Sequence, residues 1–271
     1  MKLAVIGGGW AGLAAAVAAT QQGQSVTLIE MAAQSGGRAR SLGEQPRLDN
    51  GQHILIGAYK QSLSLMRAVG VDVEQALLRM PLRLRYPDHE GLRLPPGPPL
   101  LAFARGVLAY RAWPLAARLQ LLATASGWLL RGFDCPPQLS VAQLSAGLPA
   151  QVNAELIAPL CVAALNTPAP QASAQVFLRV LRDALFGGRG ASDLLLPRRP
   201  LSELLAEPAE AWLQAQGARL RLGTRVQTLA QAEGGGWHVD DERFDAVILA
   251  CPAAEAARLA RLVAPAWAAK A

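Results

Sequence analysis

The N-terminal segment of the chain restricts its fold more than any other part. Residues 3–6 form an uninterrupted apolar run that is too short for a helix and is typical of a buried parallel strand. The run leads directly into Gly7, Gly9 and Gly12, and the Ala-rich stretch 11–22 predicts a helix. A second apolar run, 25–30, ends in Glu30. Strand, glycine turn, helix, strand and acid in this order predict a βαβ unit.

Each glycine of this turn has a physical purpose if a dinucleotide binds there. Gly7 permits the tight turn, Gly9 lets the backbone approach a pyrophosphate, and Gly12 lets the helix pack close to the strand. The helix directs its free N–H groups and positive dipole end at the phosphates. Glu30 can accept hydrogen bonds from the ribose hydroxyls, and it would repel a 2′-phosphate. The unit therefore predicts FAD or NAD rather than NADP.

A secretory signal is a competing interpretation of the small and apolar residues 3–19. Three consecutive glycines interrupt the apolar stretch, however, and Lys2 is the only basic residue before it. Cleavage there would also remove the glycine turn. We therefore favour the nucleotide interpretation.

Composition narrows the classes of protein to which the chain can belong. At 271 residues the chain is long enough for two domains. Its three cysteines have no paired spacing and its three histidines form no ligand cluster, which predicts a reducing compartment and no metal site. The formal net charge is +6, yet there is no basic tail or nucleic-acid-binding motif, so we expect no nucleic-acid partner. An apolar run of about 18 residues, which a spanning helix needs, is missing from the sequence.

The pattern along the chain predicts an α/β protein whose Rossmann-like domain is split in sequence. Residues 1–70 and 200–271 are its two parts, and 71–199 form an inserted, mainly helical substrate domain. Within the insert we expect helices at 100–132, broken before Pro114, and at 140–147, 150–165 and 171–186. After a helix at 201–216, the sequence predicts strands at 218–222, 225–230, 237–239 and 244–250.

A second glycine-containing loop follows Glu30. Gly36 and Gly37 allow the main chain to pass close to a ligand, and Arg38 supplies a fixed cation for a diphosphate. The alternative is a solvated surface loop with a basic side chain. Its position just after the ribose-binding acid favours the phosphate role.

Taken together, these motifs resemble the flavin amine oxidase and phytoene desaturase superfamily. The resemblance includes the glycine turn, Glu30, the segment 36–40 (Gly-Gly-Arg-Ala-Arg) and the segment 244–252 (Phe-Asp-Ala-Val-Ile-Leu-Ala-Cys-Pro). Three further segments are similar to the hydroxysqualene dehydroxylase family: 49–53 (Asp-Asn-Gly-Gln-His), 159–167 (Pro-Leu-Cys-Val-Ala-Ala-Leu-Asn-Thr) and 192–197 (Ser-Asp-Leu-Leu-Leu-Pro). The resemblance covers essentially the whole chain.

The resemblance implies FAD as the cofactor and assigns roles to matching positions. It places five residues near the pyrophosphate: Gly7, Gly9, Trp10, Ala11 and Gly12. It places Gly37 and Arg38 beside the diphosphate. Glu30 would bind the adenosine ribose, and the backbone of Val226 would meet the adenine. Gly51, Gln52 and His53 would lie beside the flavin ring. For Val226, an ordinary strand valine is the alternative.

One departure from the family is expected. Members normally run well past 271 residues, and a glycine-aspartate segment near their C-terminus contacts the flavin. Nothing after Pro252 matches that segment. The sequence therefore predicts that the C-terminal part of the family fold is missing, which would make the chain a fragment or a shortened relative.

The middle segment bears on the substrate. From 91 to 133 there is no acidic residue, while five arginines alternate with Leu, Ala, Phe and Trp. Such helices can lie on an anionic bilayer, so we expect membrane-surface contact through residues 100–132. The alternatives are core-facing helices with solvated arginines, or the lining of a hydrocarbon tunnel. The expected location is cytoplasmic and peripheral on the inner membrane face.

For function, the resemblance implies an FAD-dependent oxidoreductase that acts on a hydrophobic isoprenoid. In the dehydroxylase family the reaction is reductive dehydroxylation of hydroxysqualene to squalene in hopanoid biosynthesis. His53 is the candidate acid for the departing hydroxyl, because histidine titrates near neutral pH, and Asp49 is the second candidate. A structural His53 is the alternative. At the level of function, the alternatives are a phytoene desaturase-like or amine oxidase-like flavoenzyme, an NAD dehydrogenase, and a non-catalytic nucleotide-binding remnant.

Overall fold

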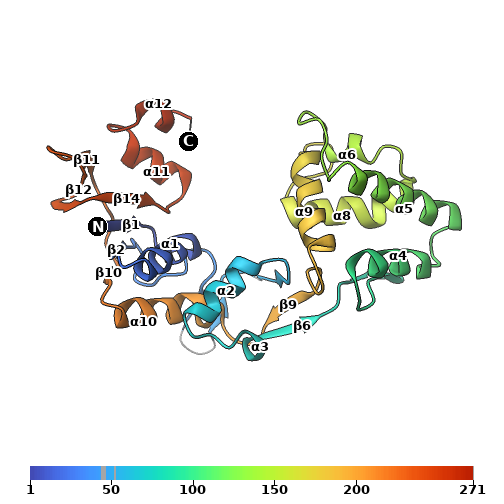
Figure 1. Ribbon diagram of the computed structural model, residues 1–271, viewed down its shortest axis with the longest axis horizontal. Coiled ribbons are helices and arrows are strands. Elements are labelled where there is room, and N and C mark those ends of the chain that lie inside the picture. Colours follow the sequence, from blue (N-terminus) through green and yellow to red (C-terminus); the bar gives the residue numbers. More distant parts are fainter. Residues whose placement is uncertain (44–46, 52, 271) are drawn as a thin grey trace. The chain divides into compact units, whose positions relative to one another are not determined.

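The apolar run near the N-terminus forms a central strand of a parallel sheet. The computed structural model describes residues 1–43, 47–51 and 53–270. In it β1 (Lys2–Ile6) lies between β2 (Ser25–Ile29) and β14 (Ala246–Leu249), and β10 (Arg219–Arg221) pairs with β2 (Figure 1). All three pairings are parallel, and the strand order is β10-β2-β1-β14. This sheet confirms the predicted α/β, Rossmann-like fold class.

Both faces of this sheet are covered, which explains why β1 is apolar without alternation. Helix α1 (Trp10–Gln21) packs against the sheet and contacts α10 (Glu207–Ala215). Ala4, Ile6 and Ile29 belong to a buried apolar cluster that also contains Phe244 and Leu259. The cluster joins the sheet to an antiparallel meander and to α11 (Ala253–Ala260). The meander consists of β11 (Leu229–Gln231), β12 (Trp237–Val239) and β13 (Glu242–Phe244).

Two of the predicted strands are wrong in their bounds. The expected strand 225–230 is paired only from Leu229 onward, because the backbone groups before it bond to the side chains of Asp240 and Arg258. The expected strand 244–250 is two strands, β13 and β14. Between them the Asp245 N–H donates to the carbonyl of Lys2 at 2.8 Å, where the chain leaves the meander and joins β1.

The described residues form two compact units. Unit 1 comprises 1–53, 61–78 and 197–271, and unit 2 comprises 54–60 and 79–196. The sequence predicted domain boundaries at 70/71 and 199/200. In the structure, by contrast, the segments 71–78 and 197–199 lie with unit 1 and the short segment 54–60 lies with unit 2. Helix α3 (Val73–Ala76) contributes the buried Val73 and Ala76, and the N–H of Arg198 donates to the Ala76 carbonyl at 2.9 Å. Remaining elements of unit 1 are β3 (Ser41–Leu42), β4 (Leu48–Asp49), α2 (Lys60–Ala68, whose first residue belongs to unit 2), the π-helical turn η2 (Ser202–Ala206) and α12 (Pro265–Ala268).

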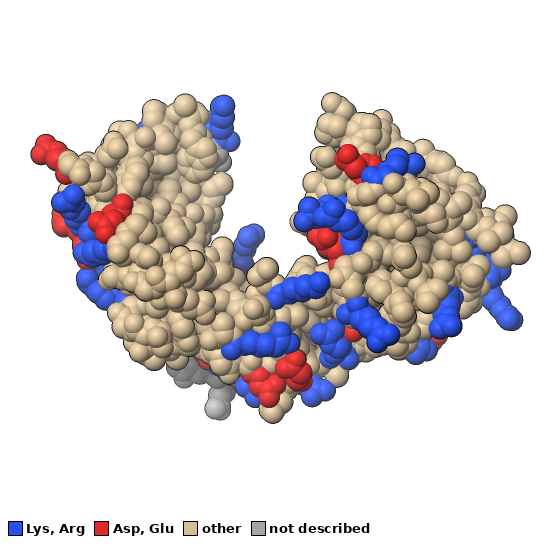
Figure 2. Space-filling model, in the orientation of Figure 1, with Lys and Arg blue, Asp and Glu red and all other residues tan. Residues whose placement is uncertain are grey.

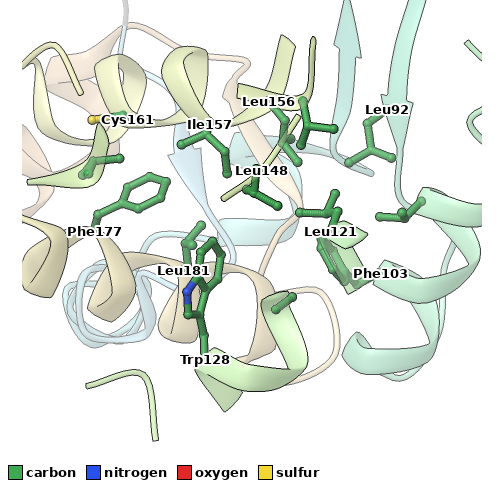
Figure 3. Packing of buried hydrophobic residues seen from close by; sticks show 14 of the residues in the cluster. Leu92, Phe103, Leu121, Trp128, Leu148, Leu156, Ile157, Cys161, Phe177 and Leu181 are labelled. Carbon is green, nitrogen blue, oxygen red and sulfur yellow. The ribbon is translucent and has the colours of Figure 1, made fainter. Parts of the chain in front are cut away.

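Unit 2 is mainly helical and has its own core. Figure 3 shows labelled side chains converging from several helices, among them Phe103, Leu121, Ile157 and Phe177. Its helices are α4 (Pro99–Ala109), α5 (Leu115–Leu130), α6 (Val141–Leu144), α7 (Ala150–Val152), the π-helical turn η1 (Asn153–Ile157), α8 (Ala158–Leu165) and α9 (Ala174–Phe186). Its strands are β5 (Leu55–Ile56), β7 (Arg83–Arg85), β8 (Glu90–Arg93) and β9 (Leu194–Pro197), with β6 (Leu77–Met80) where the chain enters the unit. Within 1–43, 47–51 and 53–270, no helix combines the length and apolar character needed to cross a membrane.

Candidate functional site: a nucleotide cradle in unit 1

Two glycines of the N-terminal turn are required by the packing of the chain itself. A Cβ on Gly12 would lie 1.8 Å from the carbonyl oxygen of Gly7, so only glycine lets α1 begin this close to β1. Gly7 has a φ of +110°, and a Cβ there would lie 2.6 Å from the Ala250 carbonyl oxygen. The turn is therefore held between β1 and the end of β14.

Gly9 is different, because its surroundings leave room for a side chain. Its φ is −68°, and the nearest atom to a Cβ built there is the Gly37 Cα at 4.0 Å. The loop after β2 approaches the same point, since the Gly36 N–H donates to the Gly8 carbonyl at 2.8 Å and Gly9 forms an isolated bridge with Gly36. The structure thus brings the two glycine loops that the sequence assigned to phosphates side by side.

The first turn of α1 faces this place with unpaired donors. Gly9 is the N-cap and provides no side-chain acceptor, and no acidic residue lies in the first turn. The N–H groups of Trp10, Ala11 and Gly12 therefore have no acceptor within the helix. Trp10 is half-buried and Ala11 is exposed. Such a helix end is an anion-binding site.

Glu30 lies at the end of β2 and is buried, with 9% of its surface exposed. Its Oε2 accepts the N–H of Gly8 at 2.6 Å, and its Oε1 accepts the N–H of Ala32 at 2.8 Å. These bonds fix the carboxylate beside the glycine turn, and each oxygen keeps a lone pair for a further donor such as a sugar hydroxyl. The ribose role of Glu30 stays a prediction, and this placement is compatible with it.

The segment around His53 lies next to Arg38. The Arg38 carbonyl accepts the side-chain amide of Asn50 at 3.1 Å, and the Asn50 N–H donates to the Arg40 carbonyl at 2.9 Å. Among the described residues the exposed guanidinium of Arg38 has no partner, so it is available to a ligand. His53 Nδ1 lies 3.2 Å from the carbonyl oxygen of Gly51. Gln52 lies outside the described residues.

Asp49, the second candidate acid, is committed to structure. Its Oδ1 accepts the hydroxyl of Ser41 at 2.7 Å and the N–H of Leu201 at 2.9 Å. These bonds join β4 to β3 and to the segment that precedes α10. A carboxylate with this arrangement is a structural acceptor, which favours His53 over Asp49 as the acid.

Cys251 follows β14 beside the same turn. Burial is the main cause that raises the pKa of its thiol above the ordinary value. The thiol therefore stays protonated at neutral pH, and it is not an activated nucleophile.

We call the glycine turn, the second glycine loop and Glu30 the cradle. Val226 follows a segment that is hydrogen-bonded to the Glu30 side of this cradle. The Thr224 N–H donates to the Glu30 carbonyl at 2.9 Å and the Gly223 N–H donates to that of Ala32 at 2.8 Å, so the chain that leads to Val226 runs beside Glu30. Val226 is buried, and its N–H has no acceptor among the residues that the structure describes.

The residues of unit 1 fit a flavin dinucleotide. A side chain at Gly9 would meet open space, so the packing of the chain does not require a glycine there. The first N–H groups of α1 face that space, and the carboxylate of Glu30 is fixed beside it. Two buried donors, the backbone N–H of Val226 and the indole N–H of Trp10, lack acceptors within the described part of the chain. An adenine-bearing diphosphate offers phosphate, hydroxyl and ring-nitrogen groups that match these features.

Sequence reasoning missed several contributors to this cradle. Gly8 donates to Glu30, and its place in the run of three glycines was the available signal. Asn50 connects the Arg38 loop with the His53 segment, although the sequence assigned it no role. Thr224 and Arg258 act on residues far away in the chain, so no local pattern could reveal them.

Unit 2 carries the basic, apolar segment. Arg118 donates to the Leu108 carbonyl at 2.5 Å and joins α5 to α4. Arg105, Arg111 and Arg131 are exposed and form no ion pair within the described residues. Figure 2 shows Lys and Arg side chains spread over the visible face of this unit, with few Asp and Glu among them. A cavity of ≈ 460 Å³ also lies in unit 2, and its lining includes Leu94, Ala102, Leu185 and Ser192.

Comparison with known families and proteins agrees with this geometry. The profile described as flavin-containing amine oxidoreductase matches residues 10–271. A protein of Sinorhizobium fredii named hydroxysqualene dehydroxylase is 30% identical over 277 residues, which cover 94% of this chain and 62% of that protein. One of the same name from Rhodopseudomonas palustris is 30% identical over 273 residues, with coverage of 94% and 62%. The chain thus spans less than two thirds of the curated relatives it matches.

Solved structures share the fold. An oxidoreductase from Methanosarcina mazei superimposes with a TM-score of 0.70 at 18% identity, covering 98% of this chain and 64% of that one. A putrescine oxidase bound to putrescine gives a TM-score of 0.59 at 19% identity, covering 96% and 60%. At these identities the likeness extends to the fold alone.

Proposed function

The chain belongs to the flavin-containing amine oxidoreductase family, and from this membership we propose that it is an oxidoreductase acting on a polyprenyl or triterpenoid lipid. The family makes FAD its cofactor. Within that class we propose the reductive dehydroxylation of hydroxysqualene to squalene, as part of hopanoid biosynthesis. The name shared by three relatives at 27–30% identity supports this choice.

The observation that carries the proposal is the cradle formed by the glycine turn, the second glycine loop and Glu30. Gly7, Gly9, Trp10, Ala11 and Gly12 would face the pyrophosphate, where the helix end attracts negative charge. Glu30 would hold the ribose, and Gly37 with Arg38 would lie at the diphosphate. Val226 would meet the adenine through its backbone. The flavin end would lie at Gly51, Gln52 and His53.

In this reaction a hydroxyl group is replaced by hydrogen. The C–O bond breaks, the oxygen takes up a proton and leaves as water, and a hydride forms the new C–H bond. FAD, when bound in its reduced form, supplies that hydride. The chain must therefore supply a proton and exclude bulk water from the site.

His53 is the residue we assign to the proton. Its Nδ1 faces the carbonyl oxygen of Gly51, an arrangement in which Nδ1 carries a hydrogen and Nε2 is left as the second protonation site. The imidazolium would then release its proton from Nε2 to the departing hydroxyl oxygen. His53 would have to regain a proton before the next turnover.

We assign collection of the lipid to unit 2. Its helices α4 and α5 expose leucines together with arginines and carry no acidic residue, which matches the surface of an anionic bilayer. Such contact would place the protein peripherally on a membrane, where an insoluble substrate is dissolved.

The test is a product assay with the purified chain, FAD, a chemical reductant and detergent-dispersed hydroxysqualene. Squalene formation by the wild-type chain, and its loss in Glu30→Ala, is the expected result. Phytoene and simple amines are assayed in parallel under oxidising conditions. Turnover of either in place of hydroxysqualene would reassign the reaction, and FAD binding without any turnover would contradict the proposed activity.

A further inference from the structure

The segment 225–228 is fixed by side chains rather than by strand pairing. On one side, the Oδ1 of Asp240 accepts the N–H groups of Gln227 at 2.9 Å and Thr228 at 2.8 Å. On the other side, Arg258 reaches the segment from α11. Its Nη2 donates to the carbonyl oxygen of Val226 at 2.5 Å, and its Nη1 donates to that of Gln227 at 2.9 Å.

Arg258 is itself held in place by a carboxylate. Glu255, one turn earlier on α11, accepts from Arg258 Nη2 at 2.7 Å and from Arg258 Nε at 3.0 Å. Arg225 binds the same carboxylate, with Nη2 3.0 Å from Oε2. Hydrogen bonds from Arg258 and Arg225 lower the pKa of Glu255 to about 2, so the carboxylate is ionised throughout the neutral range. We call Arg225, Glu255 and Arg258 the arginine clamp.

The clamp leaves the buried backbone N–H of Val226 unused. Both carbonyl groups at 226 and 227 and both N–H groups at 227 and 228 have partners, whereas the N–H of Val226 has none among the described residues. Val226 is only 3% exposed, so this N–H is also largely screened from water. An unpaired buried N–H costs free energy, and an acceptor on a ligand would remove that cost.

The unused donor belongs to the nucleotide end of unit 1. Two residues before Val226, the Thr224 N–H is bonded to the carbonyl of Glu30, the residue proposed to hold the ribose. The base of an adenosine is attached to that ribose, and its ring nitrogens are hydrogen-bond acceptors. An N–H at this position therefore matches the chemistry of adenine.

We propose that Arg258 is a positioning residue for adenine recognition: held by Glu255, it fixes the carbonyl groups of Val226 and Gln227 so that the Val226 N–H donates to the adenine ring. The inference rests on the proposed function, because it requires the cradle to bind FAD. Arginine suits the task since its planar fork binds two carbonyl oxygens and a carboxylate at once, which a lysine ammonium on a flexible stem does with less rigidity.

The test compares ligands that do and do not carry adenine. Dissociation constants of the 271-residue chain are measured by calorimetry for FAD, ADP and inorganic pyrophosphate. In Arg258→Gln we expect FAD and ADP to bind about tenfold more weakly, a loss typical of one hydrogen bond, with pyrophosphate binding unchanged. Arg261→Gln is the matched control, because this exposed arginine lies directly after α11 and has no partner among the described residues.

The outcomes separate the clamp from the cradle. Equal ADP binding in Arg258→Gln and the wild-type chain would overturn the clamp alone, and so would an equal loss of pyrophosphate binding, which signals general damage. A wild-type chain that binds neither FAD nor ADP would overturn the proposed cofactor site and the clamp together. Glu255→Gln, which keeps Arg258 but weakens its anchor, is the second variant, and it is expected to weaken ADP binding by a smaller factor.

Discussion

At the residue scale, Gly9 and Gly12 lie three positions apart and meet opposite surroundings. The carbonyl oxygen of Gly7 lies 1.8 Å from the position of a Gly12 Cβ, whereas the atom nearest to a Gly9 Cβ, the Cα of Gly37, is 4.0 Å away. The fold explains Gly12, whereas only a ligand would explain Gly9. The motif predicts these two different roles, and the structure adds the backbone atom that a Gly12 side chain would meet and the open space beside Gly9.

This difference predicts opposite effects of two alanine substitutions. Gly12→Ala should reduce the free energy of unfolding by about 3 kcal/mol, because overpacking forces α1 away from β1. Gly9→Ala should change it by less than about 1 kcal/mol, since the poorer N-cap and the lower entropy of the unfolded chain offset each other. It should nevertheless weaken FAD binding at least about tenfold by blocking the pyrophosphate.

Chemical denaturation and FAD titration of both variants provide the measurements. Gly23→Ala is unsuitable as a control because Gly23 has a φ of +74°, so Gly147→Ala serves instead: Gly147 has ordinary φ and open space around its Cβ position. A Gly9→Ala chain that binds FAD like the wild type would contradict the cradle.

At the element scale, α5 carries apolar residues on two faces. Ala117, Leu121, Ala125 and Trp128 are buried in the core of unit 2 at helical spacing. Leu115, Leu119 and Leu130 are 56%, 52% and 88% exposed, and Arg131 follows at the end of the helix. The face with Ala117 and Leu121 packs in the core of unit 2. The face with Leu115, Leu119 and Leu130 is exposed, and its apolar character suits contact with a lipid surface.

From this second face we predict binding to anionic membranes. Replacing Leu115, Leu119 and Leu130 with Gln should weaken binding to phosphatidylglycerol-containing vesicles about tenfold or more, because three side chains lose apolar burial. High salt should weaken the wild-type interaction as well, since it screens Arg105, Arg111 and Arg131 from the headgroups. Vesicle co-sedimentation measures both effects.

The matched control is Leu262→Gln, which removes an 87% exposed leucine from unit 1. It should leave vesicle binding unchanged. Thermal unfolding of the triple variant should match that of the wild type, because none of the three leucines belongs to the core. Equal vesicle binding by the wild type and the triple variant would reject α5 as the contact.

At the scale of the whole molecule, we expect stability at high pH to depend on a buried tyrosine of unit 2, Tyr110. Glu155, in the π-helical turn η1, accepts the indole N–H of Trp113 at 2.8 Å and the hydroxyl of Tyr110 at 3.1 Å. Tyr110 is 9% exposed. Burial, followed by the hydrogen bond and the charge of Glu155, raises the pKa of Tyr110 from 10.0 to about 12.

This shift predicts a loss of stability in alkali. The unfolded chain releases the Tyr110 proton near its ordinary pKa of 10.0, whereas the folded chain keeps it until about 12. The contribution is therefore complete below pH 10 and is lost as the pH rises toward 12, with a total of about 3 kcal/mol. Between these two values the free energy of unfolding should fall more for the wild type than for Tyr110→Phe.

Urea denaturation across this pH range gives the comparison, with phenolate absorbance as an independent record of tyrosine ionisation. Tyr59→Phe is the control, since Tyr59 is 47% exposed and should show the wild-type pH dependence. A Tyr110→Phe variant that follows the wild-type curve would show that Tyr110 does not titrate in this way.

Much of the fold and part of the candidate site follow from local patterns. The βαβ start, the helical insert and the Glu30 assignment depend on residues close together in sequence, where apolar periodicity, glycine conformation and charge act directly. The bounds of the strands near 225 and 244 do not, because the partner of each backbone group there is chosen by residues such as Asp240, Arg258 and Lys2.

The sequence by itself predicted the class of fold, because a strand, glycine turn, helix, strand and acid in this order are typical of a nucleotide-binding βαβ unit. Its resemblance to a known family then implied FAD as the cofactor. Only the tertiary structure decided which side chains hold Val226 and Gln227, and where the nearby strands begin and end. The reason is physical: backbone conformation is set by neighbours in sequence, whereas the hydrogen bond between Arg258 and Val226 joins residues 32 positions apart and forms only once the chain between them has folded.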